Sequence, residues 1–260
     1  MDRFAEAGAL LVREHGEGVR FHSLSESHGL RDVADAYAVQ DEYVRLMQAS
    51  GRAAAGYKIG LTSKTMQAMC GIAHPIAGVM HSDVVHQSGV SLNLSQYGRL
   101  GLEFEIAVRI GKDVEPGAKL ETIEQLADHV RDVCAAVEVV DDRHADYAKL
   151  DPLTLIADNS WNAGIVLGEF RADWRDLENC VGRVHLDGQP AGEGSGRDVL
   201  GHPLQPLLWL TQHLAAKSLV LPAGAIVTTG SMVRTVFPEN PCQYRFEVEG
   251  IGSVEVNVTA

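Results

Sequence analysis

The clearest strand signal in this chain is LEFEIAV, at residues 102–108. Successive side chains of a strand point to opposite faces, so the apolar residues share one face and Glu103 and Glu105 share the other, about 7 Å apart. Such a pair of acids occurs on the solvent-facing side of antiparallel strands. It also suits a hard divalent cation, because Mg²⁺ binds carboxylate oxygens. The pair alone leaves both interpretations open.

A third acid stands where a charge is costly. Glu138 lies within CAAVEVV, residues 134–140, which is apolar on both faces and predicts a strand buried from two sides. Burial of an unpaired charge is avoided by pairing, by metal binding or by protonation. A buried arginine partner or a neutral acid would explain Glu138 alone. Metal binding explains it together with Glu103 and Glu105, so we expect these three carboxylates to hold one divalent cation.

Lys58 lies in GYKIGLTS, residues 56–63, which predicts a short strand flanked by glycines and followed by a helix over 64–69. Small neighbours let other groups approach the backbone closely. Burial and a nearby cation would lower the pKa of this lysine, which suits a group that transfers protons. The alternative is an ordinary lysine whose ammonium group reaches water.

Beyond these motifs, the chain divides into a helical first part and a strand-rich remainder. Helical periodicity covers residues 3–14 and 31–50, and later 121–131 and 203–216. Besides the strand around Lys58, we expect strands over 76–80, 102–110, 134–140, 162–167, 181–187, 225–229, 243–248 and 252–258. Many strands with few helices between them indicate a mixed sheet or β-roll rather than a doubly wound parallel sheet.

We therefore expect an α+β fold in two parts. Residues 1–70 form an N-terminal helical segment that includes the Lys58 strand, and residues 71–260 form a mixed β-roll that carries the catalytic groups. A length of 260 residues suits such a main domain with a smaller attached part.

Charge and hydropathy exclude several function classes. The net charge of −13 and the absence of a basic stripe argue against nucleic-acid binding, which depends on clustered lysine and arginine. No apolar run reaches the roughly 18 residues of a membrane span. The first residues do not resemble a secretory leader, so we expect a cytoplasmic protein.

Two other patterns carry no chemistry. The four cysteines are far apart and form no CxxC pair, so we interpret them as reduced structural residues. The glycine-rich stretch at 192–197 matches neither GxGxxG nor the Walker spacing, and we expect a flexible loop there. The GxSxG signature of a serine hydrolase is absent.

Several motifs, taken in order, carry a family resemblance. They are GxKIGLTS at 56–63, ExE at 103–105, VEVVDDR at 137–143, ADN at 157–159, GHPL at 201–204 and EGIGSV at 249–254. In this order and spacing the chain resembles, over nearly its whole length, the 2-keto-4-pentenoate hydratase and 4-oxalocrotonate decarboxylase family. That family belongs to the fumarylacetoacetate-hydrolase-like superfamily.

The resemblance implies a fold, a cofactor and a set of site residues. The fold would be a mixed β-roll of the fumarylacetoacetate-hydrolase C-terminal type, assembled as a homo-oligomer. Mg²⁺ or Mn²⁺ would be held by Glu103, Glu105 and Glu138, and Lys58 matches the family's active-site lysine. The residues expected to bind substrate are Leu61, Thr62, Asp158, Ser160, Thr229 and Gly230.

The implied activity is that of a metal-dependent lyase of aromatic meta-cleavage catabolism. Its substrates would be 2-oxo-alkenoate (2-hydroxydienoate) acids, converted through a metal-bound enolate. Hydration is our first interpretation, because hydratases are widespread in the family. Decarboxylation is the alternative, because Ile76 in the turn PIAG, residues 75–78, stands where the hydratases carry Asp, and because Asp151-Pro152 favours the same branch.

Other features bear on the choice of substrate and class. A decarboxylase substrate has two carboxylates, and the sequence offers only Lys64 or Arg143 as a second cation. His81 and Asp83 are expected in an exposed loop. The segment NSWN, residues 159–162, departs from the small residues usual in the family and indicates a reshaped pocket. A C–C bond hydrolase lacks support because no His-Glu pair lies between the Lys58 and Glu103 motifs, and a non-catalytic binding protein stays an alternative.

Overall fold

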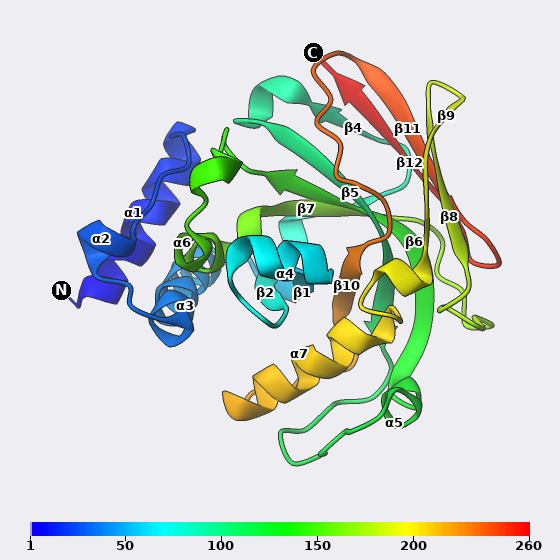
Figure 1. The fold of residues 1–260 in the computed structure, drawn as a ribbon, viewed down its shortest axis with the longest axis horizontal. Helices are drawn as coiled ribbons and strands as arrows, with labels where there is room; N and C mark the ends of the chain where they lie inside the picture. Colours follow the sequence, from blue (N-terminus) through cyan, green and yellow to red (C-terminus); the bar gives the residue numbers. More distant parts are fainter. Residues whose placement is uncertain (1) are drawn as a thin grey trace.

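The computed structural model describes residues 2–260 and has an α+β fold in which two mixed sheets pack face to face (Figure 1). The larger sheet contains, in spatial order, β2 (Ile76–His81), β1 (Ala54–Gly60), β10 (Ile226–Ser231), β5 (Leu100–Ile110), β6 (Val130–Asp141), β7 (Asn162–Leu167) and β3 (Val85–Gln87). The smaller sheet contains β4 (Val90–Asn93), β12 (Gly252–Thr259), β11 (Cys242–Val248), β8 (Val181–Leu186) and β9 (Gln189–Ser195). Parallel pairs, such as β1 with β10, occur beside antiparallel ones, which confirms the expected mixed fold.

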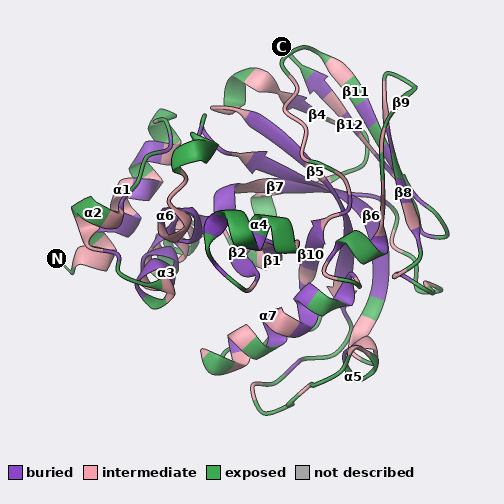
Figure 2. Ribbon diagram, viewed as in Figure 1, coloured by how far each residue is buried: buried purple, intermediate pink, exposed green. Residues whose placement is uncertain are grey.

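The main hydrophobic core lies between the two sheets. Phe104 on β5 and Val137 on β6 project into it, and Phe246 and Val256 meet them from the smaller sheet. Because side chains alternate along a strand, the acids of β5 and β6 project from the opposite face. Figure 2 shows that β5, β6 and β7 are buried along most of their length.

The helices cover the sheets from two sides. The first group is α1 (Arg3–Glu17), α2 (Ser25–His28), α3 (Val33–Ala49) and α6 (Pro152–Ala157), and these four lie together at one side of the molecule (Figure 1). Leu11, Val39 and Ala157 form part of their shared core. The others are α4 (Lys64–Cys70), α5 (Ile123–Ala127) and α7 (Leu204–Ala216), and α7 packs its leucines against the main core. No helix within residues 2–260 is long and apolar enough to cross a membrane.

A buried ion pair ties the first helix to the strands. Arg143, just after β6, donates to Asp158 at the end of α6, with 2.9 Å between Nη2 and Oδ2. His15 on α1 contacts the same carboxylate. All three side chains are brought together from distant parts of the sequence, so the network fixes α1 and α6 against the sheet.

Two expected elements differ in the structure. The helix expected over 121–131 is shorter, because β6 begins at Val130, where it pairs with Ile110 of β5. The glycine-rich stretch at 192–197, expected as a flexible loop, forms the end of edge strand β9 and a 3-10 turn. A Cβ atom on Gly194 would lie 1.9 Å from the carbonyl oxygen of Met232, so the glycine is needed for close packing rather than for flexibility.

The expected boundary at residue 70, between the N-terminal helical segment and the β-roll, stays a prediction. β1 is hydrogen-bonded between β2 and β10, so residues before 71 contribute a strand to the larger sheet as well as the helices.

Candidate metal and substrate site

Three carboxylates converge on the face of the larger sheet that points away from the main core. We call Glu103, Glu105 and Glu138 the carboxylate trio; one oxygen from each lies within 4.8 Å of the others. The strand register explains the meeting, because Glu103 lies directly opposite Glu138 in the antiparallel β5–β6 pair. Glu105 and Glu138 are fully buried and Glu103 is half-buried.

On β5, each acid has one oxygen held by the protein. Glu105 Oε2 accepts a hydrogen bond from the backbone N–H of Gly230, at 2.7 Å. Glu103 Oε1 accepts one from the Thr235 hydroxyl, also at 2.7 Å. The second oxygen of Glu105 is buried and accepts no hydrogen bond from the part of the chain that the structure describes. Such an oxygen is costly unless another ligand occupies it.

Glu138 on β6 repeats this arrangement. Its Oε1 atom accepts from Asn162 Nδ2 and lies 3.2 Å from Lys58 Nζ, whereas its Oε2 atom is buried and accepts no hydrogen bond from any residue in 2–260. One oxygen of Glu138 and one of Glu105 are thus free inside the protein. A divalent cation fits this donor set, because hard cations bind carboxylate oxygens.

The trio is under electrostatic strain without a cation. Burial raises the pKa of Glu105 well above its ordinary value, and repulsion from Glu138 and Glu103 raises it further. Burial likewise raises the pKa of Glu138 to about 7, although the neighbouring Lys58 acts in the opposite direction. Mutual repulsion of buried acids is relieved by protonation or by a bound cation.

The pKa of Lys58 is shifted in the direction opposite to our expectation. Its side chain is about 5% exposed, and this burial acts to lower the pKa. The charges of Glu138, Glu103 and Glu105 outweigh burial, and the pKa of Lys58 is raised above its ordinary value. The sequence-based expectation considered a cation beside Lys58 but not the full negative charge of the trio.

A cavity of about 320 Å³ opens beside the trio and Lys58. Glu103 and Lys58 form part of its wall, and so do three of the residues expected to bind substrate, Leu61, Thr62 and Ser160. The wall also includes Ile76, Tyr147, Leu155, Trp161, Asp198, Met232, Arg234 and Thr235, among others.

A left-handed turn shapes one wall of the cavity. Asn159, Ser160 and Trp161 have φ values of 50°, 52° and 58°, a backbone region that costs energy for residues other than glycine. The Asn159 side chain holds the turn by accepting from Val79 N at 2.7 Å and donating to Val79 O at 2.8 Å. Ser160 and Trp161 belong to the cavity wall, and the buried atoms Ser160 Oγ and Trp161 Nε1 have no hydrogen-bond partner within residues 2–260.

The remaining expected substrate residues lie behind or away from the cavity wall. Thr229 donates its hydroxyl to the Ile106 carbonyl, and Gly230 supports Glu105 through its N–H. Asp158 is fully buried in its ion pair with Arg143. Burial acts to raise its pKa, but His15 and Arg143 together outweigh burial, and the pKa lies below its ordinary value. The geometry therefore gives Asp158 a part in holding the fold.

The expectation for His81 was wrong. His81 is buried at the end of β2, where its Nδ1 lies 3.1 Å from the Arg52 carbonyl oxygen, and burial lowers its pKa. Asp83 is exposed, as expected, and pairs with Arg52 at 2.7 Å. Neither residue is part of the cavity wall.

Several wall residues were not singled out from the sequence. Arg234 and Thr235 follow β10 on an irregular segment, and Tyr147 lies in a short 3-10 turn. Periodicity does not assign a face to residues in such segments. The unusual segment at 159–162 was a usable signal, because Trp161 departs there from the small residues of the family.

The fold and site define a class: a mixed β-roll that carries a carboxylate site for a divalent ion. The family model for the fumarylacetoacetate hydrolase C-terminal domain matches residues 58–259. The chain belongs to this family, and the resemblance inferred from its motifs is confirmed.

Characterised relatives span two activities. The chain is 30% identical to a 2-hydroxyhexa-2,4-dienoate hydratase of Comamonas testosteroni, with 91% of this chain and 90% of the relative covered. It is 32% identical to a 2-oxo-hept-4-ene-1,7-dioate hydratase of Escherichia coli, with 85% of each covered. Among solved structures, 4-oxalocrotonate decarboxylase from Pseudomonas putida G7, complexed with magnesium and adipate, matches with a TM-score of 0.92 and 25% identity. That match covers 98% of this chain and 97% of the decarboxylase chain.

Proposed function

We propose that this protein is a divalent-metal-dependent lyase that hydrates 2-oxo-alkenoate acids, which it binds in their 2-hydroxydienoate form. The observation that carries the proposal is the carboxylate trio, in which one buried oxygen each of Glu105 and Glu138 has no hydrogen-bond partner within residues 2–260. The third acid, Glu103, lines the cavity together with Lys58. Hydratase relatives that match along most of the chain support the choice of reaction.

The trio would hold Mg²⁺ or Mn²⁺. When bound, such an ion polarises the oxygens of a 2-oxo acid and stabilises the negative charge that develops on them. The protein contributes by fixing one oxygen of each carboxylate. Gly230 holds Glu105, Thr235 holds Glu103, and Lys58 and Asn162 both hold Glu138. The complex of a structural relative with magnesium and adipate supports this assignment.

Lys58 is the group that would move a proton. Its ammonium lies 3.2 Å from Glu138, and Lys58 belongs to the cavity wall. It can pass the proton released by the enol hydroxyl to a substrate carbon and, as water adds, pass one proton of that water to the neighbouring carbon. Apolar side chains such as Leu61 and Ile76 surround it and limit the access of bulk water. Ser160 Oγ has no partner within residues 2–260 and can hold the attacking water.

Decarboxylation is the second candidate. The turn expected at 75–78 is instead the start of strand β2, whose first residue, Ile76, is buried and forms part of the cavity wall. It therefore brings an apolar group, not a carboxylate, to the cavity. A reaction that releases CO₂ needs no acid there to activate water. The decarboxylase among the structural relatives supports the same branch.

The test measures whether consumption of a 2-hydroxydienoate depends on Mg²⁺. The protein is first treated with a chelator, Mg²⁺ is then added back, and the loss of substrate is monitored by ultraviolet absorbance. We expect turnover only with metal, and a loss of at least about 100-fold in Glu138→Gln. Glu115→Gln, at an exposed acid that is not part of the cavity wall, is the control. Normal turnover of Glu138→Gln at limiting Mg²⁺ would contradict the proposal.

Product analysis separates the two reactions. Hydration predicts a hydroxylated 2-oxo acid without CO₂, whereas decarboxylation predicts one CO₂ for each substrate consumed. Ile76→Asp should increase hydration relative to CO₂ release if the residue at this position selects the branch. An unchanged product ratio would show that Ile76 does not control the reaction.

A further inference from the structure

The segment after β10 crosses directly over a metal-site strand. Met232 N donates to the Phe104 carbonyl at 2.8 Å, and Val236 and Leu102 exchange backbone hydrogen bonds of 2.9 and 3.1 Å. Both anchor points lie on β5, one on either side of Glu103. The residues between them, 233–235, are therefore held as a short bulge beside that carboxylate.

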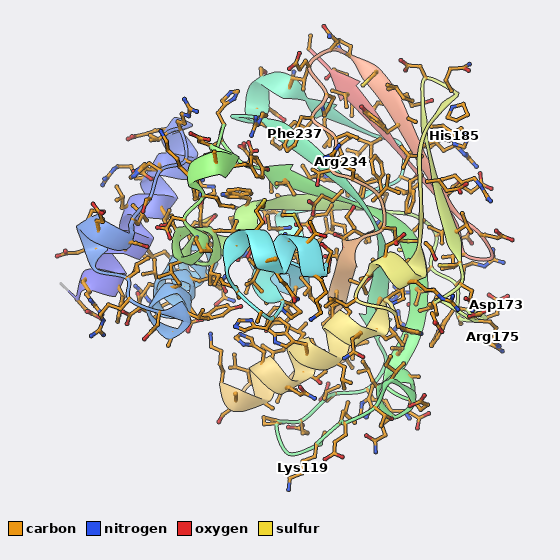
Figure 3. The ribbon with its side chains drawn as sticks, viewed as in Figure 1. Lys119, Asp173, Arg175, His185, Arg234 and Phe237 are labelled. Atoms are coloured by element: carbon orange, nitrogen blue, oxygen red, sulfur yellow. The ribbon has the colours of Figure 1, made fainter. Side chains whose placement is uncertain are left out.

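Arg234 stands at the apex of this bulge. Its neighbour Thr235 donates to Glu103 Oε1 at 2.7 Å, and Arg234 belongs to the same cavity wall as Glu103 and Lys58. Figure 3 labels Arg234 on the segment that joins β10 to β11. The anchored backbone on both sides limits where the exposed side chain can reach.

The guanidinium of Arg234 lacks a partner in an acidic protein. Within residues 2–260, Arg13 and Arg234 are the arginines that form neither an ion pair nor a hydrogen bond, although the chain has a net charge of −13. Arg13 is an exposed residue of α1, away from the cavity wall. Asp198 shares the wall with Arg234, but it accepts from Ser195 N and forms no ion pair with Arg234.

Other cations are not available to the cavity. Arg143 is about 2% exposed and is neutralised by Asp158. Lys64 donates to Gln67 at 3.2 Å and is not part of the wall, and Lys58 is paired with Glu138. Arg234 is thus the cavity's one unpaired cation among the described residues, and an arginine suits a carboxylate because two parallel N–H groups can bind its two oxygens.

We infer that Arg234 binds a second carboxylate, at the end of the substrate remote from the 2-oxo acid group, so that the preferred substrate is a 2-oxo-enedioate. The inference deepens the proposed function and rests on it. The 2-oxo acid end lies at the trio, and the distal carboxylate lies at the Arg234 bulge. The selection of a dicarboxylate substrate by Arg234 does not depend on whether the reaction is hydration or decarboxylation.

The test compares two unreactive ligands that differ by one carboxylate. Isothermal titration calorimetry with Mg²⁺ present would measure the binding of 2-oxoadipate and of 2-oxohexanoate to the whole protein. The unmodified protein should bind 2-oxoadipate about tenfold or more tightly, as expected for a charged hydrogen-bonded pair. Arg234→Gln should lose most of that preference and keep its affinity for 2-oxohexanoate. Arg234→Lys should retain part of the preference, and Arg13→Gln should retain all of it.

The outcomes distinguish this inference from the proposed function. Equal binding of the two acids by the unmodified protein, or an undiminished preference in Arg234→Gln, would overturn the role of Arg234 alone. A failure of both acids to bind in a Mg²⁺-dependent manner would overturn the proposed function, and this inference with it.

Discussion

At Lys58, burial and charge act on one ammonium group in opposite directions. Burial lowers its pKa, and the three neighbouring carboxylates raise it by a larger amount. A divalent cation held by the trio would cancel most of that negative charge and leave burial as the stronger effect. The protonation of Lys58 is therefore linked to metal binding, which is a useful property in a residue that must both give and accept a proton.

Replacing Lys58 should separate proton transfer from metal binding. In Lys58→Met we expect turnover to fall by about 10²- to 10⁴-fold, the usual contribution of a positioned acid or base. Mg²⁺ affinity should not weaken, because the substitution removes a positive charge that competes for Glu138. Steady-state kinetics and calorimetry measure the two effects, with the exposed Lys112→Met as control. Weakened Mg²⁺ binding with normal turnover would contradict the assignment.

The buried acids also predict a pH dependence of stability. The pKa of Glu105 is raised above its ordinary value of 4.5, so the folded protein binds this proton more tightly than the unfolded chain does. Metal-free protein should therefore lose stability as the pH rises above about 4.5, because ionisation then opposes folding.

Glu105→Gln should remove this penalty. In urea unfolding with chelator, the stability of the variant relative to the unmodified protein should increase from pH 5 to pH 8. Glu115→Gln, at an exposed acid, should show a constant difference over the same range. A constant difference for Glu105→Gln would mean that its carboxyl group titrates normally.

The carboxylate trio could be predicted at the residue scale because its signals are local. Alternation placed Glu103 and Glu105 on one face, and an acid inside an apolar strand marked Glu138. Asp158 is equally buried, but its partner is Arg143. The sequence alone does not distinguish a buried acid that lies beside other acids from one that faces an arginine, since both depend on contacts between distant segments.

Among the elements, β10 supports the site through a glycine. Gly230 has a φ of 112°, and a Cβ atom there would lie 2.1 Å from the Thr62 hydroxyl oxygen. The close approach lets β10 present the Gly230 N–H to Glu105 and brings Thr62 to the cavity wall. A single residue thus joins strand packing to the geometry of the trio.

Gly230→Ala should be more damaging than an alanine at another left-handed glycine. Gly89 has a φ of 90° and open space around it, so Gly89→Ala should cost only the backbone strain, about 1–2 kcal/mol. Gly230→Ala adds the clash with Thr62 and should lose more stability in urea unfolding and bind Mg²⁺ more weakly. Equal effects of the two substitutions would contradict the proposed close contact.

Most strands and the longer helices could be predicted, and the failures have a common cause. The register of β5 with β6 follows from their apolar patterns, but the early start of β6 at Val130 depends on pairing with Ile110. Likewise, β9 consists of residues with little strand propensity and is defined by its contact with Met232 and by pairing with β8. Tertiary contacts that override local propensity are not visible in a single sequence.

On the scale of the whole molecule, the N-terminal helices are joined to the sheet through a buried network. Asp158 receives Arg143 from the segment after β6 and His15 from α1. Removing one member of a buried ion pair leaves a charge without compensation. The two parts of the chain should therefore unfold together, while the boundary at residue 70, the homo-oligomer and the cytoplasmic location stay predictions.

Asp158→Asn tests this connection. It should destabilise the protein by about 3–5 kcal/mol, because Arg143 stays buried without its counter-charge. Asp173→Asn removes an exposed pair with Arg171 and should cost at most about 1 kcal/mol. Both values come from urea unfolding at neutral pH. If the two variants were equally stable, the Asp158 network would not hold the helices in place.

The central claim concerns one ion and three acids, and a crystal grown with Mn²⁺ and pyruvate tests it most directly. Anomalous scattering would locate the manganese. We predict a single strong peak on the face of the larger sheet, over β5 and β6, about 2.1 Å from one oxygen each of Glu103, Glu105 and Glu138, with pyruvate in contact with it. A structure in which these acids bind no manganese, or in which the ion and pyruvate occupy another part of the molecule, would contradict the account.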